Sequence, residues 1–193
     1  SRTQMPGIMR LAWPAVVGNL AYSTVGLVDI KIVASLGSSA VAAVSTGHRI
    51  FWITQAVMIA VTTGTTALVA RSWGAEDRAE AAQVTRASML LCAVVALLMT
   101  LPAFFFADAL AGIFELDDAT VAAAADFIRV MSLFNVAFAV TMVIGSALRA
   151  AGDTMTPLWV GLATNVLNVV LVYGLVYGRF GLPALGVVGA ALA

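Results

Sequence analysis

Long apolar stretches alternate with short polar breaks along the whole chain. A helix needs about 20 apolar residues to cross the hydrocarbon core of a bilayer, which is about 30 Å thick. The pattern therefore predicts an all-α integral membrane protein with five full spans and the start of a sixth. The expected spans are Ile8–Leu36, Val41–Ala70, Ala87–Ala107, Val121–Leu148 and Leu158–Tyr177, with the sixth starting near Leu185.

The polar breaks indicate how these spans are connected. The break Gly37–Ser39 is so short that the second span must return antiparallel beside the first. The most polar segment, Arg71–Arg86, is expected to be a loop with an interfacial helical turn. An acidic break between Asp108 and Asp118 is expected outside the hydrocarbon. Because the sixth stretch stops at Ala193, we expect a fragment whose last helix packs against a neighbour that it does not include.

Composition excludes several classes of protein. Hydrophobic residues make up 62% of the chain and charged residues 10%, with a mean hydropathy of +1.01, whereas soluble domains contain about 25% charged residues. Ten basic and ten acidic residues leave no net charge, so we expect the lipid bilayer and no nucleic acid as a partner. The single cysteine, Cys92, allows no intramolecular disulfide, and no residues stand at metal-ligand spacing.

Motifs for enzymatic chemistry are absent from the sequence. There is no nucleophile elbow, no P-loop, no zinc-protease motif and no pair of catalytic carboxylates within a helix. We therefore expect neither an enzyme nor an organic cofactor. Since no motif would bind ATP, an ion gradient is the expected energy source for any transport.

One carboxylate, Asp29, stands inside the first apolar run. A charged side chain near the bilayer centre costs about 2.5–3.5 kcal/mol on insertion scales, and such residues mark proton or cation relays. Asp29 is therefore the leading candidate for a coupling acid. The alternatives are a static pair with Lys31 or a side chain that reaches the headgroups, but residues two apart lie on different faces of a helix.

Three asparagines accompany this acid. Asn165 and Asn168 are three apart and share one face of the fifth span. Their amides can bond a protonated Asp29 or bind Na⁺ through oxygen, and we favour Asn168 as the partner. Asn19 lies ten residues before Asp29, on nearly the same helix face, and is expected to line the same cavity. The alternative role of these amides is to join packed helices.

Three more side chains are candidates for a cavity wall. Gln55 lies in the second span, and Phe138 and Met142 lie in the fourth. Methionine and aromatic side chains adapt to flat organic molecules. The alternative is ordinary packing, in which polar side chains bond to their own helix.

The distribution of Lys and Arg predicts the orientation in the membrane. Basic residues in short loops are retained on the cytoplasmic side. A cytoplasmic amino end would place inside Arg2, Arg10, Arg71, Arg78, Arg86 and Arg149, and outside Lys31, Arg49, Arg129 and Arg179. We therefore expect the amino end to be cytoplasmic.

Four segments together resemble the multidrug and toxic compound extrusion (MATE) family, and look closest to its DinF-like bacterial branch. These segments are Trp13–Gly37, Ala67–Ala81, Leu148–Leu158 and Asn165–Gly178, and they occur in the family's order and spacing. The most specific of them reads LRAAGDTMTPL. The resemblance covers essentially the whole chain.

The resemblance implies a secondary antiporter of twelve helices in two six-helix lobes. Such proteins lie in the bacterial inner membrane and export organic, often cationic compounds in exchange for H⁺ or Na⁺. Residues 1–193 would form the amino-terminal lobe, and the carboxy-terminal lobe would be a missing partner. A lipid-linked oligosaccharide flippase of the same superfamily, which would need basic residues in its cavity, and a non-transporting membrane scaffold are the alternatives.

The resemblance also assigns roles to single residues. Asp29 matches the position of the cation-coupling acid, while Asn165 and Asn168 match the asparagines of an N-x-x-N-x-x-x-D pattern. Val172 stands where that pattern has its aspartate, so Asp29 is the only matched carboxylate. Phe127 stands where many relatives have a tyrosine, which makes it a further candidate for the cavity wall.

Overall fold

The computed structural model describes residues 5–193, with side chains from residue 12 onward. Every regular element in this part of the chain is a helix. Five of the helices are long and apolar enough to cross a membrane, which confirms the predicted number of full spans. The helices are α1 (Met5–Ala34), α2 (Ser38–Gly74), α3 (Arg78–Phe105), α4 (Ala107–Gly112), α5 (Asp118–Ala150), α6 (Met155–Tyr177) and α7 (Gly186–Leu192).

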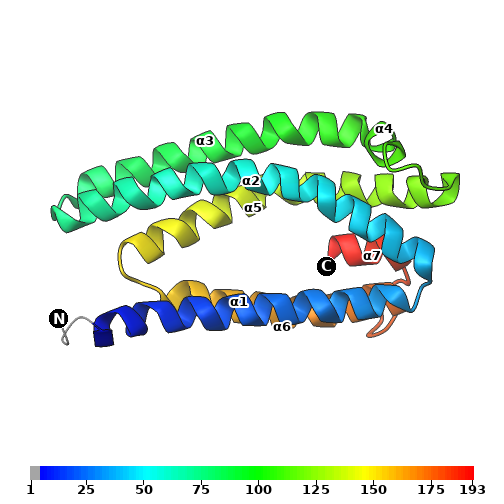
Figure 1. Ribbon diagram of the computed structural model, residues 1–193, viewed down its shortest axis with the longest axis horizontal. Coiled ribbons are helices and arrows are strands. Elements are labelled where there is room, and N and C mark those ends of the chain that lie inside the picture. Colours follow the sequence, from blue (N-terminus) through cyan, green and yellow to red (C-terminus); the bar gives the residue numbers. More distant parts are fainter. Residues whose placement is uncertain (1–4) are drawn as a thin grey trace.

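The long helices form two groups. Helices α2, α3 and α5 pack on one another, with the short α4 against α5 at one end. Helices α1 and α6 form a second pair, and they run in the same direction along the molecule (Figure 1). Helix α7 contacts both α5 and α6 and so joins the two groups at one end.

Small side chains let the helices of the first group approach closely. Without a hydrophobic driving force inside lipid, helix association depends on close packing and hydrogen bonds between helices. Ser146 Oγ on α5 donates a hydrogen bond of 3.1 Å to the backbone oxygen of Thr62 on α2. Two buried clusters fill this group, one with Ala43, Ala107, Ala111, Ala124, Ala125 and Ile128, the other with Met58, Cys92, Ala96, Ala139 and Val143.

The connection between α2 and α3 is shorter than the sequence predicted. The expected loop Arg71–Arg86 is helical except for a turn at Ala75–Asp77. Asp77 begins α3 by accepting a hydrogen bond of 2.8 Å from the backbone N–H of Glu80. Polar residues do not end a helix by themselves, and here they extend α2 and α3 beyond the apolar stretch.

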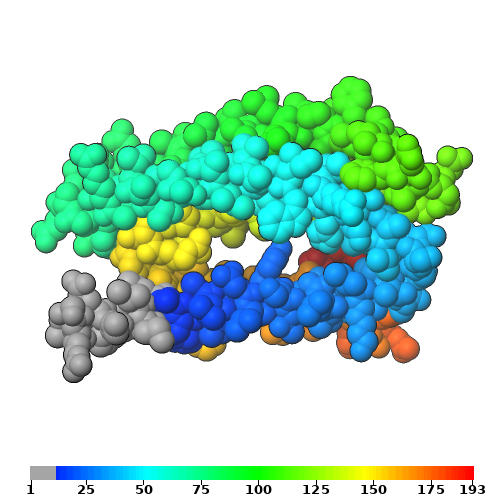
Figure 2. All heavy atoms as spheres, in the orientation of Figure 1, coloured from blue at the N-terminus to red at the C-terminus, as the bar shows by residue number. Residues whose placement is uncertain are grey.

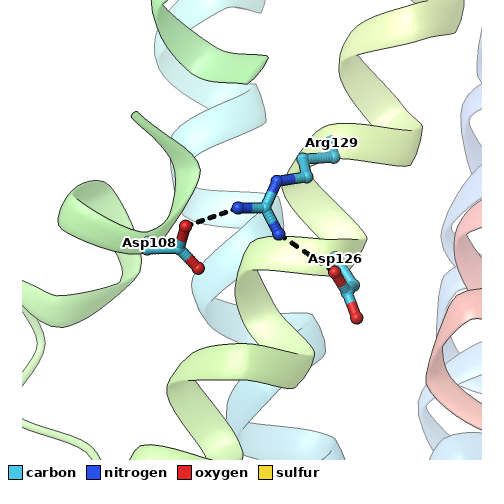
Figure 3. A network of polar contacts seen from close by, with 3 residues as sticks. All are labelled: Asp108, Asp126 and Arg129. Carbon is cyan, nitrogen blue, oxygen red and sulfur yellow. Dashed lines mark hydrogen bonds and ion pairs between the residues drawn. The ribbon is translucent and has the colours of Figure 1, made fainter. Parts of the chain in front are cut away.

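The acidic break after α3 is also partly folded. It contains α4, which Arg129 on α5 holds through an ion pair with Asp108 (Figure 3). Arg129 also donates a hydrogen bond of 3.1 Å to Asp126 on its own helix. These contacts fix α4 against the start of α5 rather than leaving the acidic break as a free loop.

The contact between Gly47 on α2 and Phe127 on α5 generates a stability prediction. A Cβ atom on Gly47 would lie 2.3 Å from Cδ1 of Phe127, whose side chain is only 1% exposed and cannot move aside freely. We expect Gly47→Ala to cost about 1–3 kcal/mol through overpacking, measured as a lower thermal unfolding temperature in detergent. Gly64→Ala on the same helix has no atom within 4 Å and serves as the control. Equal unfolding temperatures for the two variants would contradict this packing.

The start of α5 generates a prediction about pH. Asp117 accepts hydrogen bonds from the Thr120 hydroxyl at 2.7 Å and from its backbone N–H at 3.1 Å. The hydroxyl bond, followed by the backbone bond, lowers the pKa of Asp117 below its usual range. The stabilisation is therefore present above the ordinary aspartate pKa and is lost as the pH falls through the lowered value.

We expect Asp117→Ala to lower the unfolding temperature at neutral pH. The difference from the unchanged protein should shrink in acid, because protonated Asp117 no longer caps α5 as a carboxylate. Asp118→Ala, one residue further along, is the control. A difference between the Asp117 variant and the unchanged protein that stays constant with pH would count against this role.

Candidate functional site

A cavity of about 450 Å³ lies between the amino-terminal halves of α1 and α6, beside the carboxyl end of α5. The space-filling view shows open space between α1 and the group formed by α2 and α5 (Figure 2). The polar side chains that line the cavity are Asn19, Tyr22, Arg149, Thr154 and Asn165.

The way α1 packs on α6 explains why the cavity lies at this end of the pair. At the carboxyl ends the two helices are tied together, since Ser35 Oγ lies 2.6 Å from Tyr177 Oη and Ile32 packs on Val172. At the amino-terminal ends small residues take the place of such contacts. Gly18 and Gly161 both line the cavity.

Asp29 lies in the carboxyl-terminal third of α1, beyond the cavity and close to the tied end of the pair. Its side chain is half-buried, and its Oδ1 atom is buried with no hydrogen-bond partner. Within residues 12–193 the ion pairs found all involve Arg129, so Lys31 does not form the static pair considered as an alternative. A buried carboxylate oxygen without a partner is costly unless a proton, a cation or water satisfies it.

Asn168 lies on α6 with its Oδ1 atom buried and likewise without a partner. The two orphaned oxygens therefore occur on helices that pack on each other, but they are not hydrogen-bonded to each other. Val172, one turn further along, is 1% exposed and packs on Ile32 and Val28. The position where the family pattern has an acid is thus filled by an apolar contact between α1 and α6.

The asparagines and the other wall candidates fall into different parts of the molecule. Asn19 and Asn165 line the cavity. Gln55, Phe127, Phe138 and Met142 do not line this cavity, and a place for them along the transport path stays a prediction. These four residues lie on α2 and α5, where Phe127 is buried and Phe138 is 42% exposed.

Contacts with neighbouring side chains account for the positions of three of the four, but not for that of Gln55. Phe127 is buried in a cluster with Val44, and Met142 packs on the cluster around Met58. Phe138 meets the ring of Phe51 edge-on, with 5.6 Å between ring centroids. Gln55 is buried, and its Nε2 atom has no partner.

Two polar residues of structural interest were not among the sequence candidates. Arg149, in the last turn of α5, lines the cavity. Asn135 is 4% exposed and donates hydrogen bonds of 3.2 Å to the Ala96 oxygen and 3.3 Å to Thr100 Oγ1. A signal for Arg149 existed, because it stands in the LRAAGDTMTPL segment. Asn135 stands in an ordinary apolar run, where only its polarity sets it apart.

Comparison with known proteins identifies the family. The MatE family profile matches residues 14–174. The chain belongs to the MatE family. This confirms the predicted family, whose members are transporters, whereas the DinF-like branch stays a prediction. The relatives include the probable multidrug resistance protein NorM of Thermotoga maritima, 31% identical over 187 residues, and the multidrug resistance protein PmpM of Pseudomonas aeruginosa, 25% identical over 186 residues.

The MatE chain covers only part of these relatives. Each alignment takes in 96% of this chain, but 40% of the Thermotoga maritima protein and 39% of the Pseudomonas aeruginosa protein. The chain therefore spans about two fifths of the length of the curated relatives it matches.

Solved structures confirm the fold of this MatE chain. The outward-facing conformation of a multidrug resistance MATE family transporter of the MOP superfamily matches with a TM-score of 0.87 at 27% identity, over 95% of this chain and 40% of that one. A MOP superfamily transporter from Pyrococcus furiosus matches with the same TM-score and coverage. The chain is thus a multi-pass membrane protein with the fold of the amino-terminal half of these transporters.

Thiol labelling tests whether the cavity is wet. Asn165→Cys should react with a water-soluble methanethiosulfonate reagent, because position 165 lines the cavity. Val166→Cys is the matched control: Val166 is 67% exposed and does not line the cavity, and we expect it to face lipid, which suppresses thiolate formation. The native Cys92 is fully buried and should stay unreactive in both proteins. Equal labelling at positions 165 and 166 would show that the cavity is not a separate aqueous space.

Proposed function

We propose that this chain forms the amino-terminal lobe of a secondary antiporter that exports organic, often cationic compounds in exchange for H⁺ or Na⁺. On this proposal it works in the bacterial inner membrane, with its amino end cytoplasmic and a second lobe completing the transport path. No cofactor takes part besides the coupling ion.

The observation that carries the proposal is the buried Oδ1 atom of Asp29, which has no hydrogen-bond partner. A carboxylate in a membrane span is costly to retain unless it has a function. Protonation or Na⁺ binding removes the unsatisfied charge. Asp29 is also the only acid on α1, so this helix offers no other carboxylate for coupling.

Occupation of Asp29 by an ion drives transport if it changes how α1 packs. If the lobe has two packings that differ in affinity for the ion, ion binding shifts the population toward the packing that binds the ion more tightly. The same difference in affinity links the ion to the substrate, since coupling between two sites is reciprocal. On this proposal α1 moves relative to α6, because these helices carry the unpaired Oδ1 atoms of Asp29 and Asn168.

Asn168 is proposed as the polar partner of Asp29. Its orphaned Oδ1 atom can accept a hydrogen bond from a protonated carboxyl group or bind Na⁺. The packing of α1 on α6 brings the two side chains onto neighbouring helices.

The central test is substitution of the acid in the full-length protein. We expect Asp29→Asn to reduce ethidium efflux from intact bacterial cells to the level of cells without the protein, because an amide cannot gain and lose a charge. Glu80→Gln, an exposed acid in the first turn of α3, is the matched control and should leave efflux unchanged. Efflux that survives Asp29→Asn would show that Asp29 is not the coupling acid.

The identity of the ion follows from the same assay. If H⁺ is the coupling ion, collapse of the pH gradient with nigericin stops efflux while removal of Na⁺ does not. If Na⁺ is the ion, the two treatments have the opposite effects. Efflux that is indifferent to both treatments would contradict gradient coupling.

A further inference from the structure

Among the side chains that the structure describes, those of residues 12–193, Arg149 is the one charged group that lines the cavity between α1 and α6. It stands at the carboxyl end of α5 and remains exposed. Gly145, one turn earlier, leaves room for its guanidinium group, since a Cβ atom there would lie 3.3 Å from Nη1. The absence of a side chain at position 145 thus lets the guanidinium group lie back along α5.

No acid neutralises this charge within residues 12–193, where the ion pairs found all belong to Arg129. The acid nearest in sequence, Asp153, is occupied at the start of α6. Its Oδ1 atom accepts hydrogen bonds of 3.2 Å from Met155 N–H and 3.0 Å from Thr156 N–H. The cavity therefore has a net positive lining.

The other lining groups suit a polar ligand with an apolar body. Asn19, Thr154 and Asn165 offer hydrogen bonds, and Tyr22 offers an aromatic face. Leu158 and Leu162 supply apolar wall on α6. A volume of about 450 Å³ lies within the range of about 300–1,000 Å³ found for small-molecule sites.

We propose that this cavity binds the anionic group of an amphipathic molecule, a carboxylate or a phosphate, through Arg149. A guanidinium group presents its N–H groups as a planar fork that matches both kinds of oxyanion. Two sources share this chemistry: an organic compound with a carboxylate, and the phosphate of an anionic lipid.

This inference rests on the proposed function only in treating the carboxylate compound as cargo, and binding can be measured without transport. The probes are rhodamine B, which has a free carboxylate, and its ethyl ester, which has the same cationic ring system. Binding of each is measured by fluorescence anisotropy to the full-length protein in phosphatidylcholine nanodiscs. We expect Arg149→Gln to weaken rhodamine B binding about tenfold or more, as for loss of a charge-assisted hydrogen bond, and to leave the ester within twofold.

A further variant protects the test against a folding defect. Arg149→Lys keeps the charge without the fork, and we expect it to weaken rhodamine B binding less than Arg149→Gln. Unchanged unfolding temperatures would show that the selective loss is not a general loss of structure.

A second arm distinguishes the lipid source. Nanodiscs containing phosphatidylglycerol are compared with phosphatidylcholine nanodiscs, and native mass spectrometry counts the phosphatidylglycerol molecules retained by the full-length protein. A lipid ligand predicts that Arg149→Gln retains fewer of them and that phosphatidylglycerol competes with rhodamine B. A carboxylate compound as the ligand predicts selective dye loss with unchanged lipid retention.

The proposal is overturned if Arg149→Gln changes neither dye binding nor lipid retention. It is also overturned if both dyes lose affinity equally, because Arg149 would then pair with an acid elsewhere in the full-length protein rather than with a ligand. Failure of the antiport proposal looks different. In that case Asp29→Asn leaves efflux intact, while the charge-selective dye binding persists.

Discussion

The contact between α1 and α6 is the constraint on which the candidate site depends. The two helices are held together at their carboxyl ends, where Ile32 packs on Val172 and the hydroxyl groups of Ser35 and Tyr177 form a hydrogen bond. The pair is open at its amino-terminal ends, where the cavity lies. Asp29 and Asn168 belong to the same pair. Any change in how α1 packs on α6 would therefore alter both the cavity and the surroundings of the orphaned oxygens.

The other group of helices is built for rigidity. Alanines and glycine bring α2, α3 and α5 close together, and hydrogen bonds such as that of Asn135 to Ala96 cross between them. A closely packed interior deforms little. A rearrangement is therefore expected at the contact between this group of helices and the pair formed by α1 and α6. Within residues 12–193 that contact is made largely through α7 and the start of α2. The architecture thus separates a firm three-helix support from a two-helix pair that carries the polar chemistry.

The sequence predicted the spans because hydrocarbon allows only helices whose backbone groups are all paired, so the length of each apolar run is informative. It predicted the helix ends less well: Asp77 caps α3 inside a segment that composition alone assigns to a loop. It could not predict which side of a helix packs, because a span that is apolar all round shows no polar face. The family resemblance made Phe127 a candidate for the cavity wall, but its side chain is buried in the core, while Arg149 lines the cavity through its placement at the end of α5.

Val172 limits the chemistry available to the pair. An acid at this position would lie in the contact with Ile32 and would need a proton or a cation to remain there. With valine in place, the contact is apolar, and Asp29 is left as the single carboxylate on α1 and α6. On the proposed function, one ion binding event then changes the charge of the site by one unit. All of the coupling free energy must come from the difference in affinity of that single acid between two packings of α1.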